Sequence, residues 1–435
     1  MDYSNCCSCD RWGNYHYNSN HKEKEIGNVS KISIVNVNDY GDIQQSVVAA
    51  IKMIESDFHF NFLNSNSILL KPNLLVANKN ACTQPSFVEG IVSYLKEIGV
   101  SMDNVNIGDS PGQYKTSATN IAKKIGLYDI CDKLGIKFID FEGDAPIKEE
   151  IEGALRIKKY YIAKAVKECD ILINLPRLKT HAEATITGAI KNYWGIIPGG
   201  IKSKYHLLGK TPDQFGEALT DNYSWVVKNK PNRLIVYDLH TIMEGSMGPV
   251  AGTMKTWNLI LTGTDELALD LAALEIGKFK GILVPHLKIA IKRNLGIYNL
   301  NDIEFVGMSL KEAKNCTPKF KGPNEFFTKI TNYLGKIGYK ILKKIPVLSK
   351  TSCRKCGQCA QICPAKAIYF KENHYPNYLR KKCISCLCCM EMCPHHAIVV
   401  RTRGISGLNF LSKSAFKLEK FILIFSAIIV MSLFI

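Results

Sequence analysis

The sequence predicts an α/β fold, a largely parallel sheet with flanking helices, followed by a small cysteine-rich domain. Two observations support this prediction. Short β-branched runs alternate with helical patterns between about residues 28 and 310. Nine of the sixteen cysteines then lie within residues 353–393. A chain of 435 residues is also too long for one ordinary core, so two or three domains are expected.

The predicted strands of the large domain are short apolar runs separated by segments of helical periodicity. We expect strands at 31–37, 67–71, 104–108, 136–140, 169–175, 233–238 and 257–263. Between the second and third strands, residues 85–99 carry apolar side chains at helical spacing. A helix between two strands allows those strands to pair in parallel.

Polar residues follow several of these strands at the point where each strand ends. In open α/β sheets, ligands bind beyond the carboxyl ends of the strands, where the loops converge. We therefore predict one ligand site. Its predicted ligand-binding residues are Lys71, Asn73, Asp109, Asn192, Lys202, Asp238 and Asp265. The sequence contains neither a dinucleotide fingerprint after the first strand nor a Walker A loop.

Residues 172–206 concentrate lysines and histidines near one strand end. We expect the buried strand to end at Pro176 and the next residues to form a loop before a helix. Cations there could bind a carboxylate or phosphate, and a histidine could relay protons near neutral pH. The predicted catalytic residues are Lys179, His181, Lys191 and His206. The alternative is that the lysines are solvated and a histidine is only a hydrogen-bonded structural residue.

The cysteines of the small domain form two copies of one motif. Residues 353–364 and 383–394 each read C-x2-C-x2-C-x3-C-P, the run of bacterial two-cluster ferredoxins, in which the fourth cysteine ligates the other cluster. We therefore predict two [4Fe–4S] clusters. Their ligands would be Cys353, Cys356, Cys359 and Cys393 for one cluster, and Cys383, Cys386, Cys389 and Cys363 for the other. Zinc is the alternative metal, and Cys388 is interpreted as a packed surplus thiol.

Two resemblances follow from these motifs. Residues 350–402 resemble a two-[4Fe–4S] ferredoxin, which implies a small α+β, ferredoxin-like domain. Over about residues 30–310, "LLKPNL", "GDSPG", "LPRLKTHAEATITGAIKNYWGIIPG" and "LTGTDELALD" resemble the bacterial and archaeal family called domain of unknown function 362. Similar members often carry a carboxyl-terminal ferredoxin domain. The family has no settled reaction, so any catalytic role rests on the residues themselves.

The expected organisation has five segments. These are a polar disordered leader (1–27), the α/β domain (28–310), a basic linker with an amphipathic helix (311–350), the two-cluster domain (351–402) and a basic, then apolar tail (403–435). The linker helix could lie on a membrane or dock on the large domain. Residues 421–435 are uncharged but, at about 22 Å as a helix, fall short of a hydrocarbon core of roughly 30 Å.

The composition limits the partners. The formal net charge of +17 favours anionic partners, and no zinc-finger, RNA-binding or basic-zipper pattern is present, so no nucleic acid is expected. Cysteines in metal-ligand spacing without a secretory signal favour the cytoplasm, with membrane association through residues 421–435 as a hypothesis.

The function predicted from the sequence is that of an iron–sulfur oxidoreductase or electron-transfer component of anaerobic metabolism. Electrons would pass between the two clusters and the anionic ligand site, and an external electron carrier or redox partner protein and an anionic small molecule are the expected partners. The alternative is a non-redox enzyme, or a binding or assembly protein, in which the clusters are structural or only carried.

Overall fold

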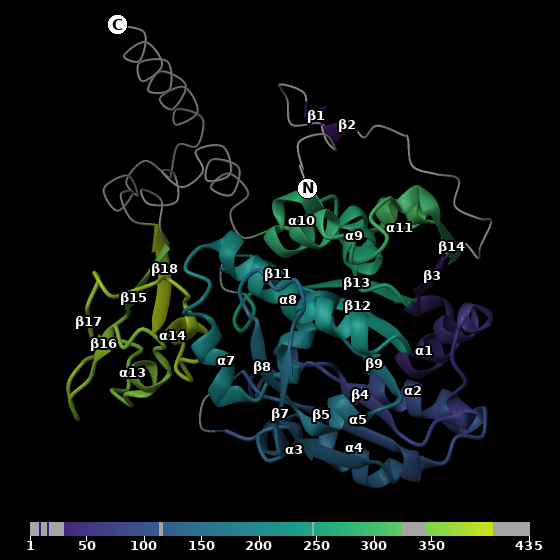
Figure 1. Cartoon of the computed structure of the whole chain (residues 1–435), viewed down its shortest axis with the longest axis horizontal. Helices are drawn as coiled ribbons and strands as arrows, with labels where there is room; N and C mark the ends of the chain where they lie inside the picture. Colours follow the sequence, from purple (N-terminus) through teal and green to yellow (C-terminus); the bar gives the residue numbers. More distant parts are fainter. Residues whose placement is uncertain are drawn as a thin grey trace, which may run out of the picture.

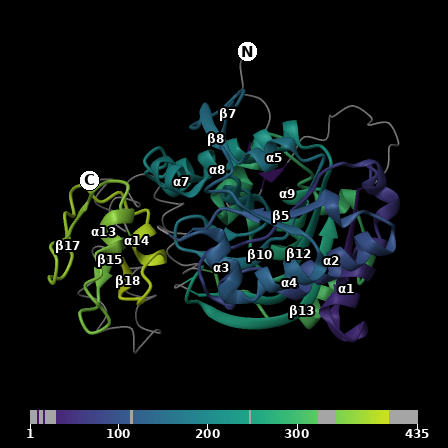
Figure 2. The same cartoon turned by 90° about the horizontal axis from the view of Figure 1, so that it is seen from below.

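The structure is a computed structural model that describes residues 8–9, 15–16, 30–112, 116–245, 248–322 and 344–402. It consists of a large α/β domain and a small cysteine-rich domain near the carboxyl end (Figure 1). Figures 1 and 2 both show the small domain beside the large one, next to helix α7 (Gly199–Tyr205).

The large domain is built on one ten-stranded sheet. Its strands follow the order β14-β3-β13-β12-β9-β4-β5-β6, and β10 pairs with both β12 and β11. Strand β13 is antiparallel to β12 and β3, and β11 is antiparallel to β10, whereas the other pairs are parallel. The bounds are β3 Ser30–Asn36, β4 Ile68–Lys71, β5 Val105–Asp109, β6 Lys137–Asp140, β9 Ile171–Asn174, β10 Arg177–His181, β11 Thr185–Thr187, β12 Arg233–Glu244, β13 Thr253–Gly263 and β14 Ile303–Gly307. The predicted α/β fold with a largely parallel sheet is confirmed.

Helices cover both faces of this sheet. One face packs against α1 (Ile43–Lys52), α2 (Pro85–Glu97), α3 (Ala118–Ile125) and α4 (Leu127–Leu134). The other face packs against α5 (Lys164–Glu168), α6 (Ala189–Asn192), α8 (Pro212–Asn229), α9 (Glu266–Ile276), α10 (Pro285–Lys292) and α11 (Leu310–Cys316). A separate hairpin, β7 (Ile147–Glu150) and β8 (Lys159–Ile162), adds buried side chains to this second core.

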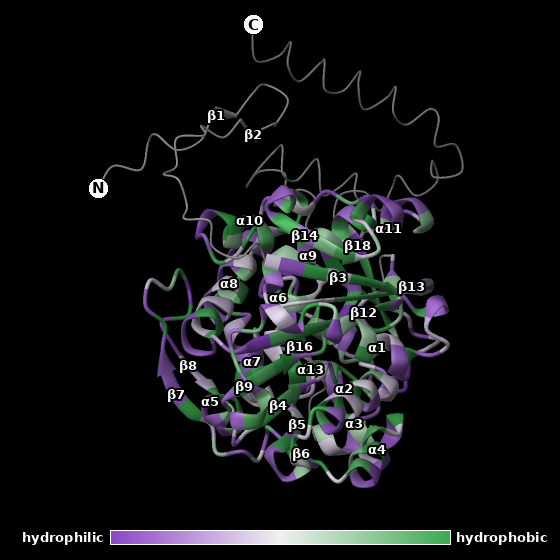
Figure 3. Ribbon diagram, turned by 90° about the vertical axis from the view of Figure 1, so that its right-hand side faces the viewer, coloured by the Kyte–Doolittle hydropathy of each residue, from purple (hydrophilic) through white to green (hydrophobic). Residues whose placement is uncertain are grey.

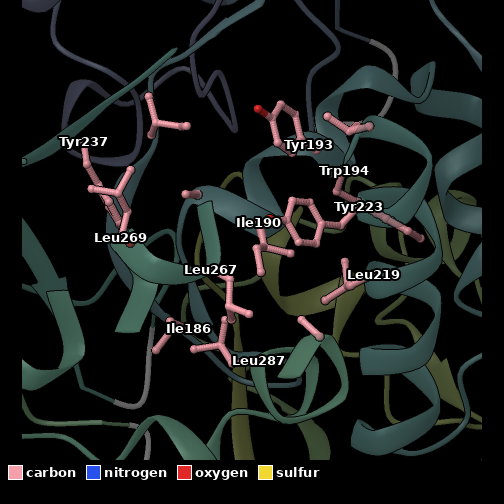
Figure 4. Close-up of a cluster of buried hydrophobic side chains, with 14 of the residues drawn as sticks. Ile186, Ile190, Tyr193, Trp194, Leu219, Tyr223, Tyr237, Leu267, Leu269 and Leu287 are labelled. Carbon is pink, nitrogen blue, oxygen red and sulfur yellow. The ribbon is translucent and has the colours of Figure 1, made fainter. Parts of the chain in front are cut away.

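The alternation of side chains along the strands divides the core into two layers. Ile68 and Leu70 of β4 point into the core beneath α1 and α2, whereas Leu69 between them points into the opposite core. Successive side chains of a strand face opposite sides, so an uninterrupted apolar strand must be buried on both. Figure 3 shows the hydrophobic central strands, and Figure 4 shows part of the larger core around Tyr193 and Tyr223.

The predicted loop after Pro176 is instead a strand, which corrects the expectation for Lys179 and His181. Residues 177–181 form β10, whose five side chains are all buried. This segment continues beside the long strand β12 and forms a hairpin with β11, so its backbone groups pair within the sheet. A loop was expected because the preceding strand was predicted to end at Pro176, but long-range pairing continues the sheet and buries these polar side chains.

The small domain contains short antiparallel ladders and two short helices. Strand β15 (Lys344–Leu348) pairs with β18 (Ile398–Thr402), and β16 (Ile368–Tyr369) pairs with β17 (Asn377–Tyr378). Helices α13 (Gln358–Ile362) and α14 (Cys388–Glu391) each contain the third cysteine of a motif, Cys359 and Cys389, and the two helices contact each other. The two motifs therefore occupy equivalent places in the two halves of the domain.

Several predicted segments fall outside the described residues. These include the amphipathic linker helix, the apolar tail and most of the leader, in which only β1 (Ser8–Cys9) and β2 (Tyr15–His16) are described, as a short antiparallel ladder. Among the residues that the structure describes, no helix is both long and apolar enough to cross a membrane.

Helix α6 carries two of the predicted site residues and is held in place by one buried carboxylate. Asp270 of α9 accepts hydrogen bonds from the backbone amides of Ala189 (2.7 Å) and Ile190 (3.1 Å), at the amino-terminal end of α6. Gly188, just before the helix, has no space for a side chain, because a Cβ there would lie 2.1 Å from the Asp270 carboxylate. Burial raises the pKa of Asp270 to about 7, and the two amides oppose that shift.

We predict that Asp270→Asn destabilises the large domain by about 2 kcal/mol, because the amide group cannot accept from both backbone N–H groups and an unsatisfied buried group costs roughly 1–3 kcal/mol. Urea unfolding followed by circular dichroism would measure the change. The exposed Asp132→Asn on α4 is the control and should change stability by less than about 0.5 kcal/mol. Equal stabilities for the two variants would contradict the anchoring role of Asp270.

Candidate functional site

A cavity lies where the carboxyl ends of β4 and β5 meet the small domain. Its empty space, including the open mouth, is about 740 Å³. Most of its wall comes from the large domain, and the rest comes from α13, α14 and the residue after α14. The titratable or amide side chains that line it are Lys71, Asn73, Asp109, His181, Lys191, Asn192, Lys202, His206, Cys388 and Glu391.

The floor of the cavity is a buried ion pair. The Nζ atom of Lys71 lies 2.7 Å from Oδ1 of Asp109, and both side chains are almost completely buried. The same carboxylate accepts the amides of Leu74 (2.6 Å) and Ser110 (2.8 Å), which fixes the loops after β4 and β5. Burial lowers the pKa of Lys71, and Asp109 opposes the shift. Gly195 packs directly on the pair, because a Cβ there would lie 2.3 Å from Asp109 Oδ1.

A chain of amide side chains extends from this floor. Asn73 donates to Asn192 (2.9 Å), and Asn192 donates to Asn174 (2.7 Å). Beneath them, Nζ of Lys179 donates to Oδ1 of Asn73 (2.5 Å) and to the carbonyl of Ala81 (2.6 Å). Burial lowers the pKa of Lys179 to about 7. Lys179 therefore acts on the cavity through Asn73, which it orients.

Two lysines of the cavity form no ion pair within the described residues, although carboxylates lie near each of them. Nζ of Lys202 donates to the carbonyls of Ser110 and Pro111, both at 2.9 Å, which leaves one of its three N–H groups for a ligand. Lys191 has no hydrogen-bond or ion-pair partner within the described residues. Burial lowers the pKa of Lys202 to about 8 and also lowers that of Lys191. An anionic ligand would compensate these two charges.

His181 joins the two domains. Its Nδ1 accepts the backbone amides of Glu183 and Ala184, both at 3.1 Å, so a neutral ring carries its proton on Nε2. Burial and nearby Lys191 hold the pKa of His181 well below its usual value, which keeps the ring neutral. Nε2 lies 3.1 Å from Oε1 of Glu391 in the small domain, although the geometry is not that of an aligned hydrogen bond.

His206 has the opposite electrostatic environment. Its Nδ1 lies 3.2 Å from Oε2 of Glu183, and its ring stacks on Phe215 with 4.6 Å between the ring centroids. Burial opposes protonation, but the Glu183 carboxylate outweighs it and raises the pKa of His206. Of the two cavity histidines, His206 is therefore the one that can hold a second proton near neutral pH.

The structure brings together eight of the eleven predicted residues of the α/β site and leaves three elsewhere. Lys179 lies beneath the cavity. Asp238 faces Arg177, with 3.4 Å between Oδ2 and Nε, and does not line the cavity. Asp265 caps α9 by accepting the Ala268 amide and also accepts the Ile297 amide. Asp265 follows β13 as predicted, but Asp238 lies within β12, which continues to Glu244, so the expected strand end at Asp238 is wrong. Backbone amides are the partners of Asp265, and Arg177 is the partner of Asp238.

Sequence reasoning missed the contributions of Glu183, Cys388 and Glu391 to this region. Glu183 is part of the segment "KTHAEA", in which only the lysine and the histidine seemed informative. Cys388 and Glu391 belong to the second cysteine motif, and only the docking of α14 brings them to the cavity. No pattern in the sequence shows which face of a small domain meets a large one.

The first predicted cluster ligand set surrounds a cavity of its own. Cys353, Cys356, Cys359 and Cys393 all line one hollow of about 330 Å³, including its open part. Cys393 comes from the second motif, as the crossed assignment requires. Burial raises the pKa of Cys359 to about 12, and the other three thiolates add to that effect. Four sulfurs that repel one another as thiolates form a donor set suited to a cationic iron centre.

In the second predicted ligand set, Cys363 of the first motif lies near cysteines of the second motif. Burial raises the pKa of Cys363, and Cys386 and Cys383 of the second motif contribute to the shift. Backbone amides of Ala367 and Ala397 donate to the sulfurs of Cys363 (3.2 Å) and Cys393 (3.3 Å), which favours the thiolate form. The residues therefore fit two [4Fe–4S] clusters. In the described parts of the chain, no group of three His, Cys, Asp or Glu side chains fits a single metal ion.

Two protein families match the chain. Residues 68–275 match the family described as Domain of unknown function (DUF362), and residues 352–400 match the 4Fe-4S dicluster domain. Both predicted resemblances are confirmed. The second match implies two [4Fe–4S] clusters rather than zinc.

The individual proteins that resemble this chain share less than a third of its residues over the aligned part. A thylakoid-associated protein of Synechocystis sp. is 28% identical over 242 residues, which are 54% of this chain and 70% of that protein. Among solved structures, a Thermotoga maritima protein has 11% identity and a TM-score of 0.33, covering 52% of this chain and 56% of that one. The lactate racemase apoprotein of Thermoanaerobacterium thermosaccharolyticum has 14% identity and a TM-score of 0.36, with 55% of each chain covered. This chain thus spans little more than half the length of those two structures.

We predict that paired cysteine substitutions will distinguish crossed from uncrossed ligation. With crossed ligands, Cys353→Ala/Cys393→Ala removes one cluster and leaves roughly half of the iron, whereas Cys353→Ala/Cys363→Ala removes both clusters and nearly all of it. Iron and sulfide analysis after anaerobic purification measures the difference, and Cys388→Ala is the control that should retain full iron. The opposite pattern for the two double variants would show that each motif ligates its own cluster.

Proposed function

Because the chain carries a DUF362 domain and a carboxyl-terminal 4Fe-4S dicluster domain, we propose that it is an oxidoreductase or electron-transfer component that acts on a small anionic ligand. The bound clusters would supply single-electron transfer to and from the cavity at the carboxyl ends of β4 and β5. The alternative, in which the clusters are structural or only carried, makes a different prediction for their reduction.

One observation carries this proposal: the ligand cavity is partly walled by residues adjacent to the cluster cysteines. Ile362 precedes Cys363, and Cys388 precedes Cys389, and both line the cavity together with the lysines of the large domain. A domain that only stabilised the fold would have no need to present its metal-binding half to a charged cavity. Their juxtaposition supports an anion site next to the proposed ligands of one cluster.

Different residues of the cavity would bind the anion and hold the proton. Lys191 and Lys202 would bind a carboxylate or phosphate, because their positive charges lack a carboxylate partner in the described residues. His206, whose pKa Glu183 raises, would hold the proton that accompanies a change in ligand charge. His181 stays neutral and presents its Nε2 proton toward Glu391. Trp194 and Leu75 add apolar wall and limit the access of water.

We predict that both clusters are reversibly reducible at low potential. Anaerobic potentiometric titration followed by electron paramagnetic resonance is the measurement, with iron and sulfide counted on the same sample. Small carboxylates and phosphate should change the signal or midpoint of one cluster, and Lys191→Gln should remove that response. Clusters that are fully loaded but cannot be reduced would support the structural alternative and refute the redox proposal.

We predict that anion binding weakens above pH 8 and depends on Lys202. Lys202 attracts an anion only while protonated, and its pKa is lowered to about 8, so affinity should be full below pH 8 and fall by up to about tenfold per pH unit above it. Lys202→Gln should lower affinity about 10-fold or more at pH 7 and reduce the pH dependence, leaving the part that comes from Lys191.

Isothermal titration calorimetry with phosphate and small carboxylates between pH 6.5 and 9.5 would test this prediction. The matched control is Lys204→Gln, an exposed lysine on the same helix α7 that does not line the cavity. If Lys202→Gln and Lys204→Gln bind the anions equally well, Lys202 does not hold the ligand.

A further inference from the structure

The small domain carries a strong excess of positive charge on its surface. Residues 350–402 contain nine lysines and arginines but only two acidic residues, Glu372 and Glu391. Glu391 is buried against His181 and cannot neutralise the surface. Within the described residues, none of the nine cations forms an ion pair. Positive charges that no nearby carboxylate pairs with create a positive electrostatic potential, which attracts an acidic partner.

Part of this charge gathers around the cavity of the first cluster ligand set. Arg354, Lys355 and His395 line that cavity together with the four cysteines. Lys350 and Lys355 both lie over the ring of Tyr375, with Nζ 5.6 Å and 4.9 Å from the ring centroid. Tyr375 is itself 40% exposed. We call this surface, composed of Lys350, Arg354, Lys355, Tyr375 and His395, the basic face.

The basic face and the ligand cavity lie on different sides of the small domain. Helix α14 supplies Cys388 and Glu391 to the ligand cavity. Tyr375 lies two residues before β17, a strand at the outer edge of the small domain, away from the large domain, in both Figure 1 and Figure 2. Cys356 of the first ligand set is exposed on the solvent side. The first ligand set is thus accessible from solvent, whereas the second motif faces the large domain.

We propose that the basic face is the docking surface for an acidic one-electron carrier protein. This inference rests on the proposed redox function and names the class of its external partner. An electron carrier must approach a cluster closely, and the exposed Cys356 is surrounded by the cations that would attract an acidic surface. Arginine and tyrosine are also enriched where proteins bind proteins. An anionic membrane could use the same charges, but its binding would not require them to surround a cluster site.

Binding of the full chain to flavodoxin, an acidic flavin-containing electron carrier, tests the proposal without any turnover. The dissociation constant would be measured by calorimetry at several salt concentrations for the wild type and for Arg354→Glu/Lys355→Glu. The matched control is Lys124→Glu/Lys133→Glu, which reverses two exposed charges on α3 and α4 of the large domain. At low salt we expect the basic-face variant to bind at least about tenfold more weakly than the control, and the gap to close as salt screens the charges.

Arg354 and Lys355 neighbour cluster ligands, so iron content is checked in each variant, and Lys350→Glu/Tyr375→Ala provides a second disruption of the face. Equal affinities for the control and both basic-face variants would overturn the proposal. So would a loss of binding to phosphatidylglycerol vesicles in these variants with flavodoxin binding unchanged, since this would identify a membrane surface. Flavodoxin binding that needs the basic face while the clusters cannot be reduced would refute the redox function and leave the docking surface standing.

Discussion

The buried ion pair between Lys71 and Asp109 is the interaction on which the ligand cavity depends. The two residues end neighbouring parallel strands, so their side chains emerge at the same edge of the sheet. Because Asp109 also binds the amides of both following loops, the pair fixes the loops as well as the charges. Removing one partner of such a pair costs about 3–5 kcal/mol, since the other charge stays buried. The absence of a side chain at Gly195 lets its backbone pack directly on the pair.

The second constraint is the contact between the two domains. Strand β10 is buried along its whole length and ends at His181, which meets Glu391 of α14. The buried Glu391 carboxyl and His181 imidazole allow few arrangements of the two domains, because a buried polar atom without a hydrogen-bond partner costs folding free energy. Oε1 of Glu391, Oε2 of Glu183 and Nδ1 of His206 all lack an aligned hydrogen bond within the described residues. Of these groups, Glu391 and His206 line the cavity, so a ligand with a hydrogen-bond donor as well as an anionic group would suit Glu391 better than a simple anion.

Residues that follow parallel strands can be located from the sequence, whereas residues whose surroundings depend on long-range pairing cannot. Polar residues at the ends of β4 and β5 converge because parallel strands place their carboxyl ends at one edge of the sheet. The positions of Lys71 and Asp109 near the site could therefore be predicted from the order of strands and polar residues along the sequence. Asp265 failed the same rule because a residue after a strand can equally cap the next helix, as it does at Ala268. Lys179 was expected in a loop, yet it lies in a strand because long-range pairing with β12 buries a polar segment. Patterns of neighbouring residues do not show which distant strands pair with each other.

The sequence by itself determined the α/β class, and it predicted the cluster ligands and most of the cations of the candidate site. Each of these follows from local spacing: alternation of strands and helices, two four-cysteine runs, and polar residues directly after apolar strands. Only the tertiary structure decided that Glu391 and Cys388 close the cavity, and that the basic face lies on the other side of the small domain. These facts depend on how two folded surfaces meet, which is set by shape and charge across residues distant in the chain.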